Sequence, residues 1–363
     1  SGDKEVAPFY KEFSQNSPST EFEGYISNEG IATILAILKE DTKIETASQG
    51  DHIEILVDKT PFYGESGGQV GDSGTAFNDN AQLELLNTIK PLSGLIVHKA
   101  KIIKGSIATG DSLTLQINKV SRKNTALNHS ATHLLHSALK EVLGEHIKQA
   151  GSLVAPDRLR FDYTHFSPLT KKERHKIESL INEKIRDNIQ VSTQEMEIEE
   201  ALKEGAMALF GEKYGDQVRV VSVPGFSKEL CGGTHVSATG DIGLFRIISE
   251  GGIASGVRRI EAVTGAVAYN KINSEYESLT AIRSILKAPS NEEFSKVKKL
   301  LEKNRELEKE ITLLKEKIVS GKNSSKEDDI KKVGDISFLI KNLDGTDAKT
   351  LRTYIDNAKN KLK

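Results

Sequence analysis

Two pairs of potential metal ligands stand at the same spacing in this sequence. His129 and His133 form the first pair, and Cys231 and His235 form the second, each separated by four positions. Side chains four positions apart on a helix lie on one face, so the two imidazoles of the first pair are close enough to share an ion. Histidine nitrogen and cysteine sulfur are ligands that zinc prefers. Together the two pairs predict one zinc site built from distant parts of the chain.

The thiol of Cys231 has two other interpretations. It is the only cysteine of the chain, and a lone cysteine is often a small buried apolar residue. A Cys231–His235 pair is also typical of a nucleophile beside its base. A nucleophile would leave the spacing of His129 and His133 unexplained, whereas a zinc site uses all of these residues. We therefore favour the metal, and we interpret His136 as a residue that supports the site or packs beside it.

The first histidine pair lies in a segment whose apolar residues recur at helical spacing. Residues 124–144 are predicted to form a helix that ends at a glycine. Strand patterns follow, and a second helix is predicted over 170–188, where Thr170 and Glu173 form a capping box. Helices mixed with antiparallel strands predict an α+β fold for a domain that spans residues 120–264.

In the region before this domain, apolar residues recur with the period of a β-strand instead of a helix. Residues 20–119 contain short runs in which apolar and polar residues alternate, such as 53–57 and 113–117, and turn signals separate these runs. A small closed β-barrel is the fold we expect, because closure removes exposed strand edges. Residues 1–19 show no such pattern, and we expect a leader without stable structure there.

The region after the α+β domain predicts long helices. Residues 265–320 are expected to form two helices joined by a short loop, as an antiparallel helical hairpin. Along the second helix an apolar seam with one polar member comprises Val297, Leu300, Asn304, Leu307, Ile311, Leu314 and Ile318. Residues 321–363 are too few to bury a core alone, so we expect a linker and a truncated C-terminal oligomerisation domain.

Composition narrows the class of protein. The 363 residues are 28% charged with a net charge of −2, so any nucleic-acid binding must come from local basic patches. No apolar stretch approaches the roughly 18 residues that a membrane span needs, so we expect no membrane partner. A single cysteine excludes an internal disulfide and suits a reducing cytoplasm, which is the location we expect.

Several motifs resemble those of a known enzyme family. The stretches NHSATHLLH and CGGTH resemble the editing domain of alanyl-tRNA synthetase and of its free-standing relatives, and more distantly that of threonyl-tRNA synthetase. Further stretches look like alanyl-tRNA synthetase in particular: PFYGESGGQVGD at 61–72, QAGS at 149–152, RLRFDY at 158–163, LFGEKYGD at 209–216 and GVRRIE at 256–261. Nothing resembles the ATP-binding core of that enzyme, so the resemblance implies a C-terminal fragment that contains the editing domain.

The resemblance implies hydrolysis of mischarged tRNA(Ala), at the ester that joins serine or glycine to the terminal ribose. It also implies one Zn2+ ion held by His129, His133, Cys231 and His235. Four protein ligands close a tetrahedral zinc, as in structural sites, whereas a catalytic zinc keeps a position open. Two roles therefore stay open, one in which the zinc positions the substrate and one in which it activates the attacking water.

The resemblance points to catalytic residues beside Cys231. Gln149 looks like a substrate-facing residue whose amide reads the serine hydroxyl or orients the water; the alternative is a hydrogen-bonded residue at the edge of a sheet. The hydroxyl of Thr132 is either a group of the pocket or a group bonded back to its own helix. We predict catalytic roles for all three residues.

Other residues are expected to contact the acceptor end of tRNA(Ala). The glycine-rich loop with Gly67, Gly68 and Gln69 is expected to flank that end, and a tight hairpin in the barrel is the alternative. Arg258 and Arg259 suit phosphate contacts, and surface salt bridges are the alternative for them.

The expected partners are tRNA(Ala), the remainder of the synthetase chain with its ATP-binding part, and a second copy that pairs through the C-terminal region. Three other functions compete with the editing enzyme. They are a tRNA-binding module with a purely structural zinc, a free-standing trans-editing protein, and an oligomerisation scaffold.

Overall fold

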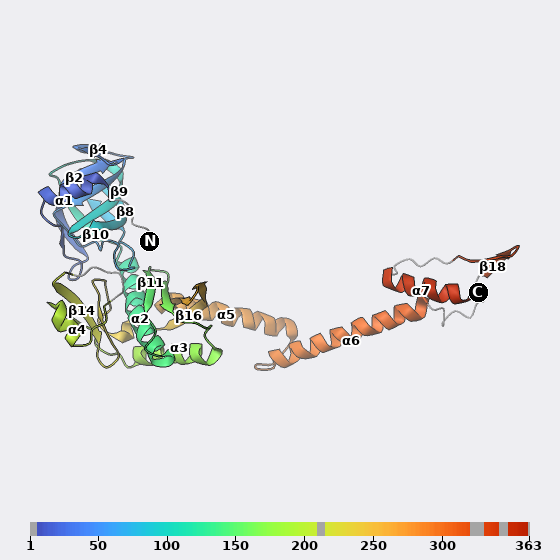
Figure 1. Ribbon diagram of the computed structural model, residues 1–363. Coiled ribbons are helices and arrows are strands. Elements are labelled where there is room, and N and C mark those ends of the chain that lie inside the picture. The colour runs from blue at the N-terminus through green and yellow to red at the C-terminus, as the bar shows by residue number, and fades with distance from the viewer. Residues whose placement is uncertain (1–5, 209–214, 320–329, 341–347, 362–363) are drawn as a thin grey trace. The chain divides into compact units, whose positions relative to one another are not determined.

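The computed structural model describes residues 6–208, 215–319, 330–340 and 348–361 (Figure 1). The chain divides into two compact units, residues 1–272 and residues 273–363, which are described separately. The first unit holds the barrel and the α+β domain, and therefore all of the predicted site residues.

A closed barrel forms where it was predicted. Its strands are β2 (Glu29–Lys39), β5 (His52–Val57), β7 (Gly74–Phe77), β8 (Ala81–Leu92), β9 (Leu95–Ala108) and β10 (Ser112–Ile117). They are hydrogen-bonded in the order β10, β7, β8, β9, β5 and β2, and β10 pairs with β2 to close the sheet. The short strands β1 (Glu21–Phe22), β3 (Thr42–Ile44), β4 (Thr46–Ser48) and β6 (Lys59–Thr60) lie at its margins. Alternation made the barrel predictable: Leu113, Leu115 and Ile117 of β10 are all buried in its core.

The expected leader is partly a helix. Residues Pro8–Asn16 form α1, and Tyr10 of this helix is buried in an apolar cluster with Leu38 and Leu56 of the barrel. The hydroxyl of Tyr10 donates to the carboxylate of Glu54. The expectation of a leader without stable structure is therefore wrong for α1. A helix of nine residues has too few turns to show a clear apolar period, which is why the sequence did not reveal it.

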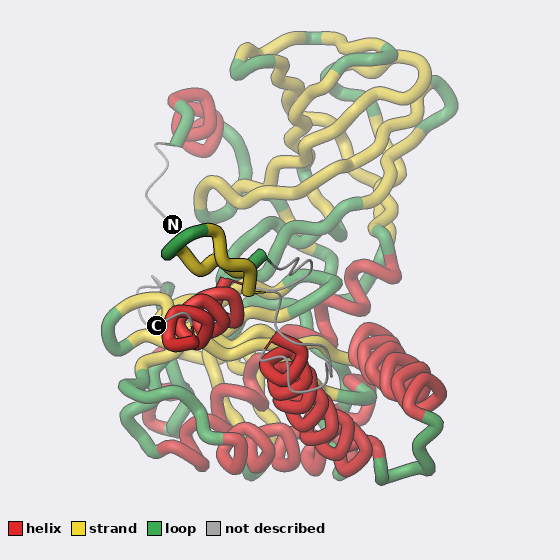
Figure 2. The backbone as a smooth tube through the Cα atoms, turned by 90° about the vertical axis from the view of Figure 1, so that its right-hand side faces the viewer, coloured by secondary structure: helices red, strands yellow, loops and turns green. Residues whose placement is uncertain are grey.

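The α+β domain follows the barrel, as predicted. Its helices are α2 (Lys119–Leu143), α3 (Lys171–Arg186) and α4 (Ile198–Lys203), with the 3-10 turn η1 (Thr239–Ile242). One antiparallel sheet contains β11 (Gln149–Val154), β12 (Leu159–Thr164), β17 (Val257–Thr264) and β16 (Phe245–Ala254) in that order, and a second contains β13 (Ser192–Glu197), β14 (Gln217–Val223) and β15 (Ser227–Leu230). Helices α2 and α3 pack against the larger sheet through a core that includes Leu134, Phe161 and Ile181. Figure 2 shows the barrel strands in yellow at the top of the view.

Helix α2 begins earlier than predicted. The expected helix covered residues 124–144, whereas α2 starts at Lys119, and the Asn118 side chain caps it by accepting a hydrogen bond of 3.0 Å from the Ser121 amide. Apolar periodicity marks only the buried stripe of a helix, so the polar first turn carried no signal. The capping box predicted at the start of α3 is confirmed.

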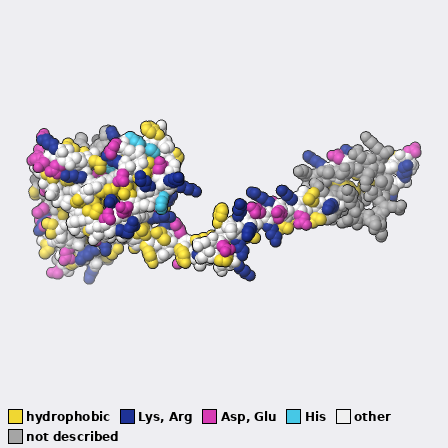
Figure 3. All heavy atoms as spheres, turned by 90° about the horizontal axis from the view of Figure 1, so that it is seen from below, with side chains coloured by type: hydrophobic (Ala, Val, Ile, Leu, Met, Phe, Trp, Pro, Cys, Tyr) yellow, Lys and Arg dark blue, Asp and Glu magenta, His cyan; other side chains and the backbone are white. Residues whose placement is uncertain are grey.

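The second unit contains the rest of α5 (Gly265–Leu286) and all of α6 (Glu293–Val319). Two helices joined by a short loop are confirmed, and Arg283 of α5 forms an ion pair with Glu293 of α6. Lysine, arginine and glutamate side chains are mixed along the surface of α6 (Figure 3). The apolar seam residues whose side chains are described are between 38% and 51% exposed. Their pairing within a hairpin therefore stays a prediction.

The predicted truncated domain over 321–363 is described only in part. Strands β18 (Ile330–Val333) and β19 (Ile336–Leu339) pair with each other, and α7 (Ala348–Lys361) follows. The rest of the predicted linker lies outside the described residues, and oligomerisation through this region stays a prediction.

Candidate metal centre

The four predicted ligands meet at one point in the first unit. His129 and His133 come from α2, while Cys231 and His235 come from the segment that follows β15, and one ligand atom from each lies within 4.8 Å of the others. The Sγ atom of Cys231 is 3.4 Å from Nε2 of His129 and 3.2 Å from Nε2 of His235. The chain thus gathers nitrogen and sulfur donors of the kinds that zinc prefers.

Two of these imidazoles are oriented by hydrogen bonds at their other nitrogen. Nδ1 of His129 lies 2.7 Å from Oε1 of Gln69, and Nδ1 of His235 lies 3.1 Å from Oγ of Ser130. An amide oxygen only accepts, so Nδ1 of His129 carries the proton and Nε2 presents its lone pair toward Cys231. Partners of this kind fix the tautomer of metal-binding histidines.

The third imidazole shares a buried carboxylate with a neighbour. Nδ1 of His133 lies 3.4 Å from Oε2 of Glu229 without good hydrogen-bond geometry, and Nδ1 of His136 lies 3.0 Å from Oε1. His136 therefore supports the centre, as we interpreted it from the sequence. Burial raises the pKa of the Glu229 carboxyl, but His133 and His136 together lower it by more, and the group stays ionised.

Burial also sets the protonation of the candidate ligands. It lowers the pKa values of His129 and His235 well below the ordinary 6.5, and the positive charge of Arg219 lowers them further. The pKa of His133 is likewise lowered by burial, although Glu229 opposes this shift. The three imidazoles are therefore neutral at neutral pH, which is the form that binds a metal.

The turn after Cys231 requires glycine at Gly233. A Cβ atom there would lie 2.1 Å from Cε1 of His129, closer than any real contact. The amide of Gly233 approaches the Cys231 sulfur at 3.4 Å, so the turn wraps around the thiol.

Side chains hold three consecutive carbonyl groups of the same turn. Nη1 of Arg219 donates to the carbonyls of Cys231 and Gly233, at 2.9 Å and 2.8 Å. The Tyr25 hydroxyl donates to the carbonyl of Gly232 at 2.5 Å, and the Arg219 guanidinium stacks 4.2 Å from the centre of the Tyr25 ring. Tyr25 belongs to the barrel region, so that region helps to fix the turn.

The glycine-rich loop supplies a residue that contacts the candidate ligands. Gln69 was expected to flank the acceptor end, but its side chain is wholly buried. It accepts from His129 and from the Thr234 amide at 2.9 Å, and it donates to Oγ1 of Thr234 at 3.0 Å. A tRNA contact by Gln69 is therefore corrected, because both ends of its amide are already occupied. Its neighbours Gly67 and Gly68 have positive φ angles of 57° and 80°, typical of a tight turn.

Gly68 also lies against the α+β domain. A Cβ atom on Gly68 would come within 2.9 Å of Cβ of Ser152, and its carbonyl accepts from the Val154 amide at 2.7 Å. Gly67 is exposed, so a contact with the acceptor end stays a prediction for this residue.

The two predicted catalytic residues beside Cys231 have different environments. Oγ1 of Thr132 donates to the Asn128 carbonyl at 2.8 Å within its own helix, and the residue is buried. Of its two interpretations, the back-bonded helix residue is the one observed, and a catalytic role for Thr132 stays a prediction. Gln149 starts β11 opposite Tyr163 and is partly exposed, so its substrate contact stays a prediction.

The two predicted phosphate ligands form internal ion pairs. Arg258 pairs with Glu250, and Arg259 makes two hydrogen bonds to Asp162, at 2.7 Å and 2.8 Å. The salt-bridge alternative is therefore present for both arginines. Contacts of the two arginines with phosphate stay predictions, and each arginine would have to leave its carboxylate partner to make them.

The sequence did not single out Gln69 as a partner of the ligands, nor Tyr25, Ser130, Arg219 or Glu229. A signal existed for Glu229, because residues two apart on an extended segment point to the same side and Cys231 is two positions further on. The others carried no recognisable spacing.

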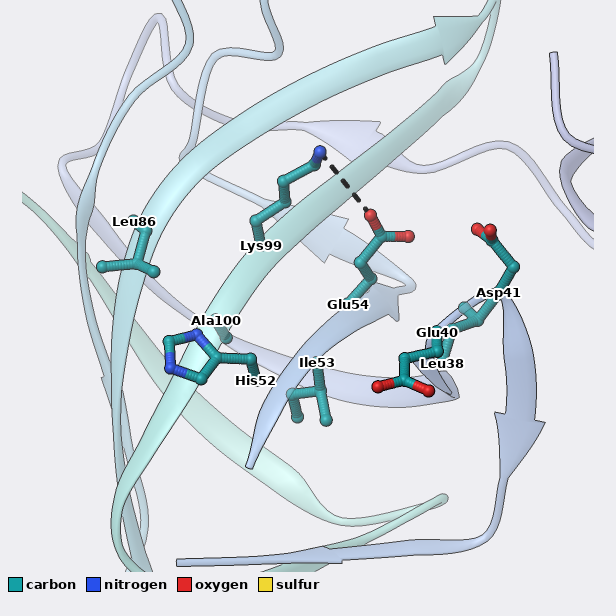
Figure 4. Close-up of a pocket in the computed structure, with 9 residues that line it drawn as sticks. All are labelled: Leu38, Glu40, Asp41, His52, Ile53, Glu54, Leu86, Lys99 and Ala100. Carbon is teal, nitrogen blue, oxygen red and sulfur yellow. Dashed lines mark ion pairs between the residues drawn. The ribbon is translucent and has the colours of Figure 1, made fainter. Parts of the chain in front are cut away.

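A separate pocket of about 300 Å3 lies on the barrel (Figure 4). Charged residues of both signs line it, including Lys99, which lies 3.8 Å from Glu54. None of the candidate ligands contributes to this pocket.

Comparisons with known proteins agree with this arrangement. Residues 2–121 match the family model of class II tRNA synthetases (A), and residues 218–261 match the threonyl and alanyl tRNA synthetase second additional domain. The second match contains Cys231 and His235. The first contains the stretch at 61–72 whose resemblance to alanyl-tRNA synthetase the sequence showed. Fold, site and matches together define a protein of the class II tRNA synthetase type that carries a second additional domain.

Related sequences identify the family within that class. Similar proteins include the alanine–tRNA ligases of Desulfosudis oleivorans (44% identical over 97% of this chain), Sinorhizobium medicae (43% over 100%) and Saccharophagus degradans (47% over 94%). The chain belongs to the alanine–tRNA ligase family. It spans 40%, 42% and 39% of the length of these three relatives. Among the described residues, no helix is long and apolar enough to cross a membrane.

Proposed function

We propose that this chain hydrolyses mischarged Ser-tRNA(Ala) and Gly-tRNA(Ala), with one zinc ion bound by His129, His133, Cys231 and His235. The observation that carries the proposal is the convergence of these four donors, within 4.8 Å, in a chain related to alanine–tRNA ligases. A site sized for alanine discriminates poorly against serine or glycine, since one small group is worth about 1–3 kcal/mol. A second, hydrolytic site removes the resulting errors.

The residues present fit a zinc ion. Each histidine is neutral at neutral pH and has its Nδ1 beside Gln69, Ser130 or Glu229. A bound zinc supplies Lewis-acid polarisation of an oxygen ligand or orients the substrate. The chain's own residues supply the rest: Cys231 is partly exposed, so the centre is accessible from solvent, and the Cys-Gly-Gly turn is held rigid by Tyr25 and Arg219.

Gln149 is the residue we propose to read the serine hydroxyl. Its amide can both donate and accept, and it is partly exposed at the start of β11. Alanine has no hydroxyl and would leave this group unpaired, which favours serine at the editing site.

A tRNA-binding module with a structural zinc is the second candidate. Four protein ligands are typical of closed structural sites, and the hydroxyl of Thr132 is bonded within its own helix. These two observations favour it. It predicts zinc binding without ester hydrolysis.

Deacylation of Ser-tRNA(Ala) separates the two candidates. We expect the purified chain to release serine faster than the uncatalysed reaction, and Cys231→Ala to lose both bound zinc and this activity. His175→Ala is the control, because His175 is an exposed histidine of α3. The editing proposal fails if the zinc-loaded protein and Cys231→Ala release serine at the same background rate. A folded protein that binds no added zinc would refute the ligand assignment.

The wider setting is also a proposal. We propose that the acceptor end of tRNA(Ala) is the partner of the centre and that the chain acts in the cytoplasm. The remainder of a synthetase chain and a second copy through the C-terminal region are further proposed partners. Support comes from the single thiol and from the greater length of the relatives.

A further inference from the structure

Five aromatic rings form a continuous stack that runs from the core of the α+β domain to its surface. The ring centres of Phe161 and Tyr163 are 6.5 Å apart with planes 18° apart, and those of Tyr163 and His165 are 6.3 Å and 21° apart. His165 and His146 follow at 5.2 Å and 28°, and His146 and Phe166 at 6.5 Å and 16°. Alternate residues of a strand point to the same side, which aligns the first three rings. We call these five residues the aromatic stack.

The inner part of the stack is rigidly anchored. Phe161 and Tyr163 are fully buried, and the Tyr163 hydroxyl donates to Glu250 at 3.3 Å. Nε2 of His146 and Nδ1 of His165 are 3.0 Å apart, and the His165 amide donates to the Gly256 carbonyl at 3.0 Å. These contacts fix the ring planes before any ligand arrives, which reduces the entropy cost of binding.

The outer end of the stack faces solvent. Phe166 is 89% exposed. Lys148, which pairs with the backbone next to His165, is exposed, and so are Lys171 and Lys172 at the start of α3. No ion pair of Lys148 is seen within the described part of the chain. The exposed acid Glu145 is paired with Lys140 at 2.8 Å.

We propose that the outer end of the aromatic stack binds an unpaired base of an RNA strand, with the adjacent lysines facing its phosphates. A run of nearly parallel rings presents a flat face at its end, and a nucleobase extends such a stack by one more ring. A flat ring covers such a face more completely than an aliphatic side chain of a protein partner does. The inference rests on the proposed function only in taking RNA as the ligand. None of the five rings belongs to the candidate metal centre.

Binding of a fluorescent single-stranded RNA of about 12 nucleotides, followed by anisotropy, tests the stack. We expect Phe166→Ala to weaken binding roughly tenfold or more, since one base on one aromatic ring is worth that much. Phe166→Trp should retain the affinity and Phe166→Leu should not, because only the former keeps a flat face. Phe294→Ala is the matched control, since Phe294 is 82% exposed on α6.

Salt dependence separates stacking from charge. Phe166→Ala should lower the affinity without changing its dependence on salt, whereas Lys148→Gln should reduce the salt slope by about one contact. The proposal is overturned if Phe166→Ala binds within twofold of the unaltered chain, if Phe166→Leu binds as well as Phe166→Trp, or if the RNA must be double-stranded.

Deacylation of Ser-tRNA(Ala) is measured with the same preparations, so that failure of the stacking proposal can be told apart from failure of the proposed function. If the unaltered chain edits and Phe166→Ala binds RNA normally, the stacking proposal alone fails. If Phe166→Ala loses RNA binding while the unaltered chain releases no serine, stacking stands and editing fails.

Discussion

Replacing Gly233 with alanine is expected to disable the candidate metal centre by displacing one ligand. The new Cβ atom would lie 2.1 Å from Cε1 and 2.3 Å from Nδ1 of His129, and 2.9 Å from Oε1 of Gln69. Carbon atoms in ordinary contact are about 3.5–4.0 Å apart, so the imidazole and the turn must separate by about 1.5 Å. A Zn–N bond of about 2.0–2.1 Å does not tolerate that displacement, so His129 is lost as a ligand.

The size of the effect follows from what is lost. Removing a group that merely orients a ligand costs about 10–100-fold in metal affinity, so loss of the ligand itself should cost at least about 100-fold. Gly232→Ala is the matched control, because its Cβ would meet nothing nearer than the Tyr25 hydroxyl at 3.9 Å. Neither Gly232 nor Gly233 has a positive φ, so backbone strain does not distinguish the variants.

Zinc affinity is measured by competition with a chromophoric chelator. Cobalt provides a second readout, because a thiolate–cobalt charge-transfer band reports whether Cys231 still binds when His129 does not. Circular dichroism confirms that both variants are folded. The steric argument is refuted if Gly233→Ala and Gly232→Ala bind zinc with equal affinity.

Two further predictions concern buried polar groups of the barrel region. Gln69→Leu removes the acceptor for Nδ1 of His129, so zinc affinity in the same chelator competition should fall about 10–100-fold; an unchanged affinity would contradict the role assigned to Gln69. Burial lowers the pKa of His98 from 6.5 to about 4. As the pH falls below 6.5, His98 becomes protonated in the unfolded chain but stays neutral in the folded barrel. The free energy of unfolding therefore decreases until the pH reaches about 4. Between about pH 7 and pH 5 the loss due to this residue is about 2 kcal/mol. Urea unfolding at the two pH values should show a loss about 2 kcal/mol smaller in His98→Gln than in the unaltered chain, and equal losses in both would refute it.

The parts of the fold that the sequence predicted are those with a local period. Alternation revealed the barrel strands, and helical spacing revealed α2 with its two histidines on one face. The four ligands were predictable because each pair lies within one short segment and the only cysteine takes part. Element ends were less accurate: α2 starts at Lys119, before its apolar stripe begins. Helix α1 was missed because its nine residues are too few to show a clear apolar period.

The residues that orient the ligands could not be predicted, since they meet only after the barrel packs on the α+β domain. Gln69 and His129 are far apart in the chain, and no spacing rule relates a barrel loop to a helix of the next domain. The same holds for Tyr25 and the carbonyl of Gly232. Gln69 was instead interpreted from its glycine-rich neighbours, which correctly indicated a tight turn but said nothing of the direction of its side chain.

Residues of the barrel region therefore belong to the candidate centre. The boundary at residue 120 marks a change from strand periodicity to helical periodicity, but residues on both sides of it contribute to the same site. Gln69 accepts hydrogen bonds from His129, in the first pair of candidate ligands, and from the amide of Thr234, which lies between the two members of the second pair. A single buried amide oxygen thus fixes the distance between those pairs. Without the barrel, two buried donors would lose their acceptor, at a cost of about 1–3 kcal/mol each. A metal centre that must hold its donors to within a fraction of an ångström has reason to keep both domains in one chain.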